Sequence, residues 1–289
     1  MGEFWPMRIL TASALIVSLL ATAVTPAHAA RSQARASEIT VTPDGFTAPA
    51  TVPEATSFRV TATDPDGAYI GLVQLRKGVS LQRYLADLEQ AYDESDPEAA
   101  LAGSRAAERD VVMYGGAAVL PGVPVTFTPT LRQGTYHLLD FKDVGSPGLE
   151  AKVRTLRVLG PGRTRPRAEA EIVQHQTARF GVSGVLRAGA PIRVTNRSRQ
   201  FNEAIFMPVR EGTTRAHVGA FFTALEAGEA ASPPFTGGPI GTVPLSPGRS
   251  TVISVGLRPG TYALVTWITD YRTGRMFAAQ GMHEIVTLK

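Results

Sequence analysis

Histidine and methionine are the side chains of this chain whose types could bind a soft metal. None of the histidines beyond residue 30 forms an H-x-H or H-x-x-x-H pair, the kind of spacing that presents two imidazoles to one metal; these residues are His137, His175, His217 and His283. Met282 precedes His283 directly, and Met207 and Met276 lie in segments that could approach them. Thioether and imidazole ligands would suit reduced copper. Methionines that fill gaps in a hydrophobic core are the competing interpretation.

The acidic and nucleophilic side chains give weaker signals. Asp140, Asp143 and Glu150 lie in one segment and could bind a hard cation, but they lack the D-x-D-x-D-G spacing of a calcium loop, so a solvated acidic loop is favoured. Ser183 lies in GVSGV, which is not the G-x-S-x-G motif of hydrolases, and we interpret it as a turn. We therefore predict that the protein is not an enzyme. An unrecognised active site at the Asp140 loop or between domains is the remaining alternative.

The composition excludes thiol chemistry and predicts export. The chain of 289 residues has no cysteine, so it has no disulfide, no lipid-bearing cysteine and no thiolate ligand. Arg8 precedes the apolar run ILTASALIVSLLATAV, and Ala27-His28-Ala29 fits a small-x-small cleavage pattern. We predict a signal peptide over residues 1–30, cleaved after Ala29 or Ala30, and a secreted or cell-envelope protein. The run is short for a spanning helix, so we expect no membrane span after cleavage.

Composition and charge also restrict the fold and the partners. Hydrophobic residues make up 44% of the chain, with 28 glycines and 21 prolines, which is typical of an ordered protein made of short strands. The net charge is +4, but the arginines are scattered. A solvated surface is therefore favoured over a nucleic-acid site, and we expect a protein, an envelope component or a small ligand as the partner.

An internal repeat organises the chain beyond the signal peptide. FRVTATDPDGAYIGLVQLRKG (residues 58–78) aligns without gaps with IRVTNRSRQFNEAIFMPVREG (residues 192–212), an offset of 134. VLPGVPVTFTPTLRQGTY (residues 119–136) aligns with LSPGRSTVISVGLRPGTY (residues 245–262), an offset of 126. The order is the same in both halves, which indicates a duplication. We predict domains at 38–160 and 168–289, joined by a linker at 161–167.

Each domain is expected to be a β-sandwich with one inserted helix. Short runs with β-branched or alternating residues, such as SFRVTAT and TYHLLDF, predict strands, and Pro-Gly turns separate the later ones. A helix is predicted after Ser80, a good N-cap, with Leu81, Tyr84, Leu85 and Leu88 on one face. The second half repeats that face, and a further helix is possible at residues 97–109. The sequence therefore predicts an all-β fold of two tandem Greek-key β-sandwiches.

The second half resembles the cupredoxin family, in the secreted bacterial form with a helix after the third strand. The resemblance is carried by RVTNRSRQFNEAIFMPVREG, LSPGRSTVISVGLRPGTYALVTW and TGRMFAAQGMHEIVTL. It implies a copper site of two histidines, one cysteine and a methionine. The resemblance places these ligands on or beside Asn202, at Thr266, at or near Phe277, and at Met282. In the first half it places the cysteine at Asp140 and the first histidine near Ala68 or Tyr69.

The ligand types at these positions predict that type 1 copper has been lost. Such a site needs a thiolate and two imidazoles, and of the four residues only Met282 matches. We expect Phe277 to fill the former cavity. The favoured function is a secreted, non-enzymatic binding protein without a cofactor. The alternative is a copper-handling or redox protein with a rebuilt site around Met282, His283 and Met207.

Overall fold

The structure is a computed structural model that describes residues 36–93, 95–162 and 165–289, and the predicted signal peptide lies outside these ranges. The strands of the first half are β1 (Ser37–Thr42), β2 (Gly45–Thr47), β3 (Thr51–Val52), β4 (Phe58–Ala62), β5 (Ala68–Leu75), β6 (Val111–Val119), β7 (Val125–Pro129), β8 (Gly134–Asp140) and β9 (Arg154–Val158). Those of the second half are β10 (Ala170–His175), β11 (Arg179–Gly184), β12 (Ile192–Asn196), β13 (Asn202–Pro208), β14 (Ile240–Leu245), β15 (Ser250–Val255), β16 (Gly260–Val265) and β17 (His283–Leu288).

The helices lie where the sequence predicts them, with additions in the first half. The α-helices are α1 (Leu81–Ala91), α2 (Pro97–Asp110), α3 (Leu149–Lys152) and α4 (Arg215–Glu226), and η1 (Phe141–Asp143) is a 3₁₀ turn. Ser80 caps α1 by accepting a hydrogen bond from the Arg83 N–H. Within the described residues, no helix is long and apolar enough to cross a membrane. The all-β prediction is confirmed, although the first half has three helices where one or two were expected.

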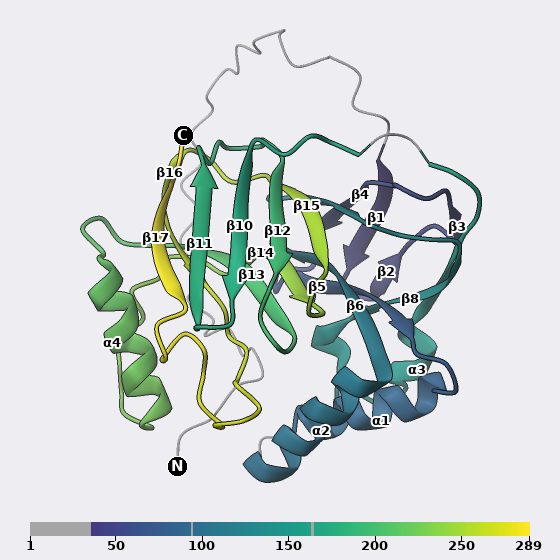
Figure 1. Ribbon diagram of the computed structural model, residues 1–289, viewed down its shortest axis with the longest axis horizontal. Coiled ribbons are helices and arrows are strands. Elements are labelled where there is room, and N and C mark those ends of the chain that lie inside the picture. Colours follow the sequence, from purple (N-terminus) through teal and green to yellow (C-terminus); the bar gives the residue numbers. More distant parts are fainter. Residues whose placement is uncertain (1–35, 94, 163–164) are drawn as a thin grey trace, which may run out of the picture.

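Both sheets run through both halves of the chain (Figure 1). Sheet A has eight strands in the order β11-β10-β12-β15-β7-β4-β1-β2. Sheet B has nine, in the order β17-β16-β13-β14-β6-β5-β8-β9-β3. Apart from β3, strands that are equivalent by the repeat lie at equal distances from the centre of each sheet. The central pair is β7 and β15 in sheet A, and β6 and β14 in sheet B. The two sandwiches are therefore joined edge to edge and related by an approximate twofold axis. The repeat alone did not predict this arrangement. The boundaries at 160 and 168 stay a prediction.

The central strand pairs show how the repeat produces this symmetry. Phe127 of β7 lies opposite Ile253 of β15, and these two residues are equivalent by the 126-residue offset. The same offset relates two tyrosine corners: the Tyr136 hydroxyl donates to Arg132 O (2.9 Å) and the Tyr262 hydroxyl donates to Arg258 O (2.8 Å). Equivalent sequences thus form equivalent turns, and equivalent strands meet at the centre.

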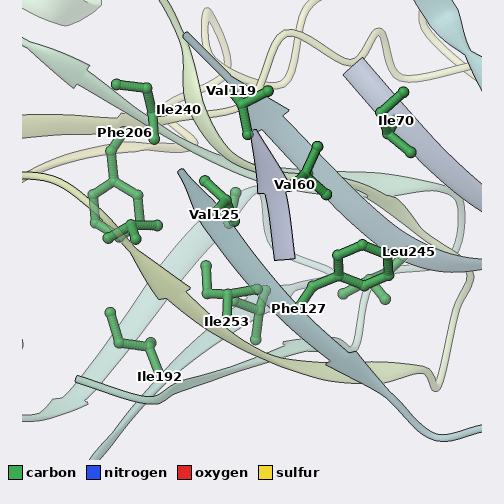
Figure 2. Close-up of a cluster of buried hydrophobic side chains, with 14 of the residues drawn as sticks. Val60, Ile70, Val119, Val125, Phe127, Ile192, Phe206, Ile240, Leu245 and Ile253 are labelled. Carbon is green, nitrogen blue, oxygen red and sulfur yellow. The ribbon is translucent and has the colours of Figure 1, made fainter. Parts of the chain in front are cut away.

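Two hydrophobic cores result from these layers. One lies between the sheets and contains side chains from both halves, including Phe127 and Ile253 of sheet A and Phe206 and Ile240 of sheet B (Figure 2). The other covers the outer face of sheet B beneath the helices and the segment between β16 and β17. That long segment, residues 266–282, contains three of the four positions named from the cupredoxin resemblance.

Two sequence-based interpretations change with the structure. Ser183 lies in strand β11, opposite Glu171 of β10, and not in a turn. The glycines around it therefore belong to an edge strand, which runs on to Gly184. The linker prediction at 161–167 includes residues 163 and 164, which lie outside the described ranges.

Candidate functional site

The four positions expected to hold copper ligands are joined by one run of hydrogen bonds. Asn202 begins β13, and its Nδ2 donates to Met282 Sδ (3.4 Å). The Met282 N–H donates to Phe277 O (2.9 Å), and the Phe277 N–H donates to Ile268 O (3.0 Å). The Ile268 N–H in turn donates to Thr266 Oγ1 (3.2 Å). The fold therefore brings together the residues that the sequence named. The run of hydrogen bonds uses side chains at its two ends and backbone groups between them.

Burial excludes water from all four positions. Asn202, Thr266 and Met282 are 0% exposed and Phe277 is 6% exposed. Phe277 and Met282 belong to the core between the sheets. Asn202 Oδ1 also accepts a hydrogen bond from the Glu203 N–H (2.9 Å). Both ends of the Asn202 amide are thus in use, which a buried amide requires.

These residues do not fit a type 1 copper centre. An amide, a hydroxyl, a benzyl ring and a thioether occupy the positions where a trigonal site needs a thiolate and two imidazoles. The thioether accepts a hydrogen bond from a neutral amide, an interaction that needs no metal. Chemically, the arrangement anchors the segment between β16 and β17 to the start of β13.

A polar network beside this run was not found from the sequence. Asn196 is fully buried; its Nδ2 donates to Gln200 O (2.8 Å) and Leu245 O (2.6 Å), and its Oδ1 accepts from the Ser198 N–H (2.8 Å). The Gln200 side chain bonds the other segment, donating to Thr269 O (2.7 Å) and accepting from the Tyr271 N–H (3.0 Å). Asn followed two residues later by Ser is an Asx-turn signal that could have indicated the first half of this network.

A buried glutamate, Glu203, and a partly buried one, Glu108, lie close to the same segments. Glu203 accepts a hydrogen bond from the Trp267 N–H (2.9 Å), and burial raises the pKa of its carboxyl to about 7. Burial likewise raises the pKa of Glu108, on α2, to about 7, although a hydrogen bond with the Phe201 backbone acts in the opposite direction. Glu108 belongs to the first half and Phe201 to the second, so this contact joins the halves.

In the first half, the cysteine-equivalent position holds a structural carboxylate. Asp140 Oδ1 accepts hydrogen bonds from the N–H groups of Tyr69 (2.9 Å) and Lys142 (3.1 Å). Burial raises the pKa of Asp140. Tyr69 is the residue expected near the first histidine position, so the structure brings these two predicted positions into contact. Ala68 lies beside Tyr69 with its side chain in the core between the sheets.

The acidic segment after Asp140 does not converge on a cation. Asp143 forms an ion pair with Lys152 (2.6 Å), and Glu150 is exposed. Among the described residues, no group of three or more His, Asp or Glu side chains is placed to hold a metal ion. The solvated or paired acidic loop is therefore the arrangement that the structure has.

The soft ligands of the alternative copper site lie on opposite sides of sheet B. Met282 lies in the core between the sheets, whereas Met207 and Met276 lie in the core on the outer face. His283 Nδ1 lies 2.8 Å from Ala278 O. Burial lowers the pKa of His283. Met282 and Met207 are thus separated by the sheet itself, and the rebuilt site is not assembled in this conformation.

Comparison with known proteins gives matches only among solved structures. No family model matches the sequence, and the comparison with curated proteins gives no match. Auracyanin A, a blue copper protein from Chloroflexus aurantiacus, is 19% identical over 41% of this chain and 96% of its own, with a TM-score of 0.26. A multicopper oxidase is 13% identical over 88% of this chain and 89% of its own (TM-score 0.23), and the copper-containing nitrite reductase of Thermus scotoductus is 14% identical over 88% and 61% (TM-score 0.22).

These similarities agree with the cupredoxin resemblance of the sequence and correct one prediction. Two of the three structures named above are an oxidase and a reductase, which are enzymes. The prediction that this protein is not an enzyme, made from the lack of a recognisable catalytic motif, is contradicted, because the similar structures include an oxidase and a reductase. The TM-scores are low, so the description of the site rests on the contacts given above.

Proposed function

We propose that this chain is an exported protein of two cupredoxin-like halves that binds a partner through its surface, its former copper positions having become structural. The observation that carries the proposal is the buried run from Thr266 to Met282 and Asn202. All four positions contribute to anchoring a segment, and none offers the thiolate that type 1 copper needs. A protein, an envelope component or a small ligand is the class of partner.

Copper binding tests the first part of this proposal. The full chain, purified without chelators, is titrated with Cu(II) while the visible spectrum is recorded, and with Cu(I) against a competing chelator. We expect no intense thiolate-to-copper absorption and no Cu(I) binding tighter than micromolar. A Met282→Leu variant is the control, because the leucine keeps the volume and removes the sulfur. Stoichiometric Cu(I) binding that this variant abolishes would overturn the proposal.

Export is tested by the mass of the mature protein. The signal-like segment supports a mature chain that begins at Ala30 or Arg31. We expect that mass for protein recovered from the medium or the cell envelope. A recovered chain that still contains residues 8–25 would contradict cleavage.

A further inference from the structure

The two outer ends of sheet B differ, although the repeat makes them equivalent. In the first half, β3 runs parallel to the outermost repeat strand, β9. The Arg157 N–H donates to Ala50 O (2.8 Å) and the Leu159 N–H donates to Val52 O (2.9 Å). The chain thus covers this edge with its own extended segment, which is one way in which proteins protect a strand edge.

In the second half, the equivalent segment covers much less of the edge. By the offset of 134, Thr51 and Val52 correspond to Val185 and Leu186. Here only the end of the edge is paired: the Lys289 N–H donates to Leu186 O (3.0 Å), and the Ala188 N–H donates to Lys289 O (2.9 Å). Strand β11 stays on sheet A as far as Gly184, whereas β2 ends at Thr47, the equivalent of Gly181. The chain therefore crosses to sheet B later and leaves a gap between the two edges.

That gap is an open cleft of about 450 Å³ between β11 and β17. Its apolar lining includes Phe180, Val182, Val185 and Leu186 on one side and Ile285 and Val286 on the other. Val182 and Val185 are 40% and 39% exposed, and among the described residues only Leu159 is a more exposed large apolar side chain. Exposed branched side chains beside a strand edge are a feature of surfaces that bind another chain.

The backbone of β17 offers hydrogen bonds into the same cleft. In an antiparallel pair, alternate residues bond the neighbouring strand. Because the N–H and C=O of Lys289 both face away from β16, those of Thr287, Ile285 and His283 do so as well. His283 O accepts a hydrogen bond from Arg215 Nε (3.1 Å). Ile285 and Thr287 therefore present the backbone groups that a further strand could pair with, and Thr287 is the equivalent of Arg157, which β3 pairs with in the first half.

We propose that the cleft between β11 and β17 binds an extended, apolar segment of a partner protein, which adds to β17 as β3 adds to β9. The proposal deepens the binding function proposed above. Main-chain hydrogen bonds to Ile285 and Thr287 would hold the segment, and the valines would select branched apolar residues at alternate positions. A neutral segment fits, because Glu284 at this edge is already paired with Arg215 (3.1 Å).

The first half supplies the probe for a test. A capped synthetic peptide with the sequence of Ala48–Pro53, APATVP, which is neutral, is titrated into the full-length, metal-free, ¹⁵N-labelled protein. We expect saturable shifts of the amide signals of Ile285, Thr287 and Val182. A peptide of the same composition in scrambled order should cause no saturable shift. The copper titration above does not involve this cleft, so the two proposals fail separately.

Two surface variants make the result decisive. Val182→Lys places a charge in the cleft at an exposed position, and it should weaken peptide binding about tenfold or more without changing the melting temperature. Leu159→Lys is the matched control, because Leu159 is equally apolar and 56% exposed but lies at the covered edge; it should bind the peptide as the parent does. No saturable shift, shifts centred on Arg157 instead, or equal binding by Val182→Lys would overturn the proposal.

Discussion

The amide of Asn202 is fully hydrogen-bonded at the position where the cupredoxin resemblance led us to expect the first histidine. A neutral imidazole at this place would need a metal or a hydrogen-bond donor for its unprotonated nitrogen. The amide instead satisfies both of its ends with Met282 Sδ and the Glu203 N–H. Thr266 behaves in the same way, because its hydroxyl accepts the Ile268 N–H and so turns the chain after β16. Asn202 and Thr266 therefore act as small hydrogen-bonding side chains, and Phe277 supplies apolar volume in the core between the sheets.

This arrangement predicts that the copper site can be restored by three substitutions. The variant Asn202→His, Thr266→Cys, Phe277→His would present a thiolate and two imidazoles together with Met282. We expect it to bind Cu(II) with intense visible absorption. Without metal it should be less stable by about 3 kcal/mol, because a buried phenylalanine is lost. The double histidine variant that keeps Thr266 is the control and should remain colourless. A colourless triple variant would mean that the four positions no longer converge.

The buried carboxyl of Glu203 predicts a stability that depends on pH. Its pKa is raised to about 7 in the fold, above the ordinary value near 4.3, so the folded state binds the proton more tightly than the unfolded state. This contribution is fully present below about pH 4 and is lost as the pH rises through about 7. We expect the free energy of unfolding in urea to fall between pH 5 and pH 8. Glu203→Gln should remove about 3 kcal/mol of that fall; an unchanged pH dependence in the variant would contradict this.

At the scale of the elements, two glycines let the central strands of sheet B approach their neighbours; they are equivalent by pairing, because Gly116 lies opposite Gly71 and Gly241 lies opposite Ile205. A Cβ on Gly116 would lie 1.9 Å from Ile70 O, and one on Gly241 would lie 2.2 Å from Ala204 O. Ile70 and Ala204 are themselves related by the offset of 134. The same backbone contact thus recurs in both halves and fixes how β6 and β14 lie beside β5 and β13.

Substitution of these glycines should lower the free energy of unfolding by more than backbone strain alone would. Gly241→Ala should destabilise the protein by about 3 kcal/mol or more, because the added Cβ would overlap a carbonyl oxygen that cannot move freely. Gly248→Ala is the control: its φ is also positive (74°), but nothing lies within 4 Å of the added Cβ, so we expect a loss of about 1 kcal/mol. Urea unfolding of both variants measures the difference, and equal losses would contradict the steric explanation.

The elements were largely predictable, and the pairing between halves was not. The repeat, the Pro-Gly turns and the apolar faces of α1 and α4 are local features, so the sequence predicted them. The pairing of β7 with β15 depends on two edges that are far apart in the chain and have no distinctive residue pattern. The burial of Glu203 was missed although a local signal existed. Glu203 shares its strand face with Ile205 and Met207, and this alternation indicates burial.

At the scale of the whole molecule, the continuous sheets should make the two halves unfold together. Strands β7 and β15 pair over five residues on each side, and β6 pairs with β14 in the other sheet. Unpairing the halves would expose four strand edges, two in each sheet, and part of a shared core. We expect one calorimetric transition whose van't Hoff and calorimetric enthalpies agree. Two separate transitions would contradict this coupling.

A separated half provides a second test at this scale. Residues 165–289 expressed alone would present β14 and β15 as unpaired edges. Because β15 pairs in the full chain with its own equivalent, we expect this fragment to form a symmetric dimer, and sedimentation should show twice the fragment mass. The Gly256 N–H donates to Pro124 O across that pairing, so Ser254, two residues earlier, also turns its N–H toward the partner strand. A Ser254→Pro fragment, which loses that N–H, is expected to associate more weakly. A monodisperse, folded monomer of the parent fragment would contradict the prediction.

The symmetric strand order also bears on the history of the chain. In a symmetric homodimer, each residue on the axis meets its own copy, and here Phe127 meets Ile253, its copy within the chain. Such a centre is what remains when the gene of a dimeric, single-domain ancestor is duplicated and fused in tandem. Divergence could then proceed separately at each outer edge, and the two edges do differ: one has a covering strand and the other borders a cleft.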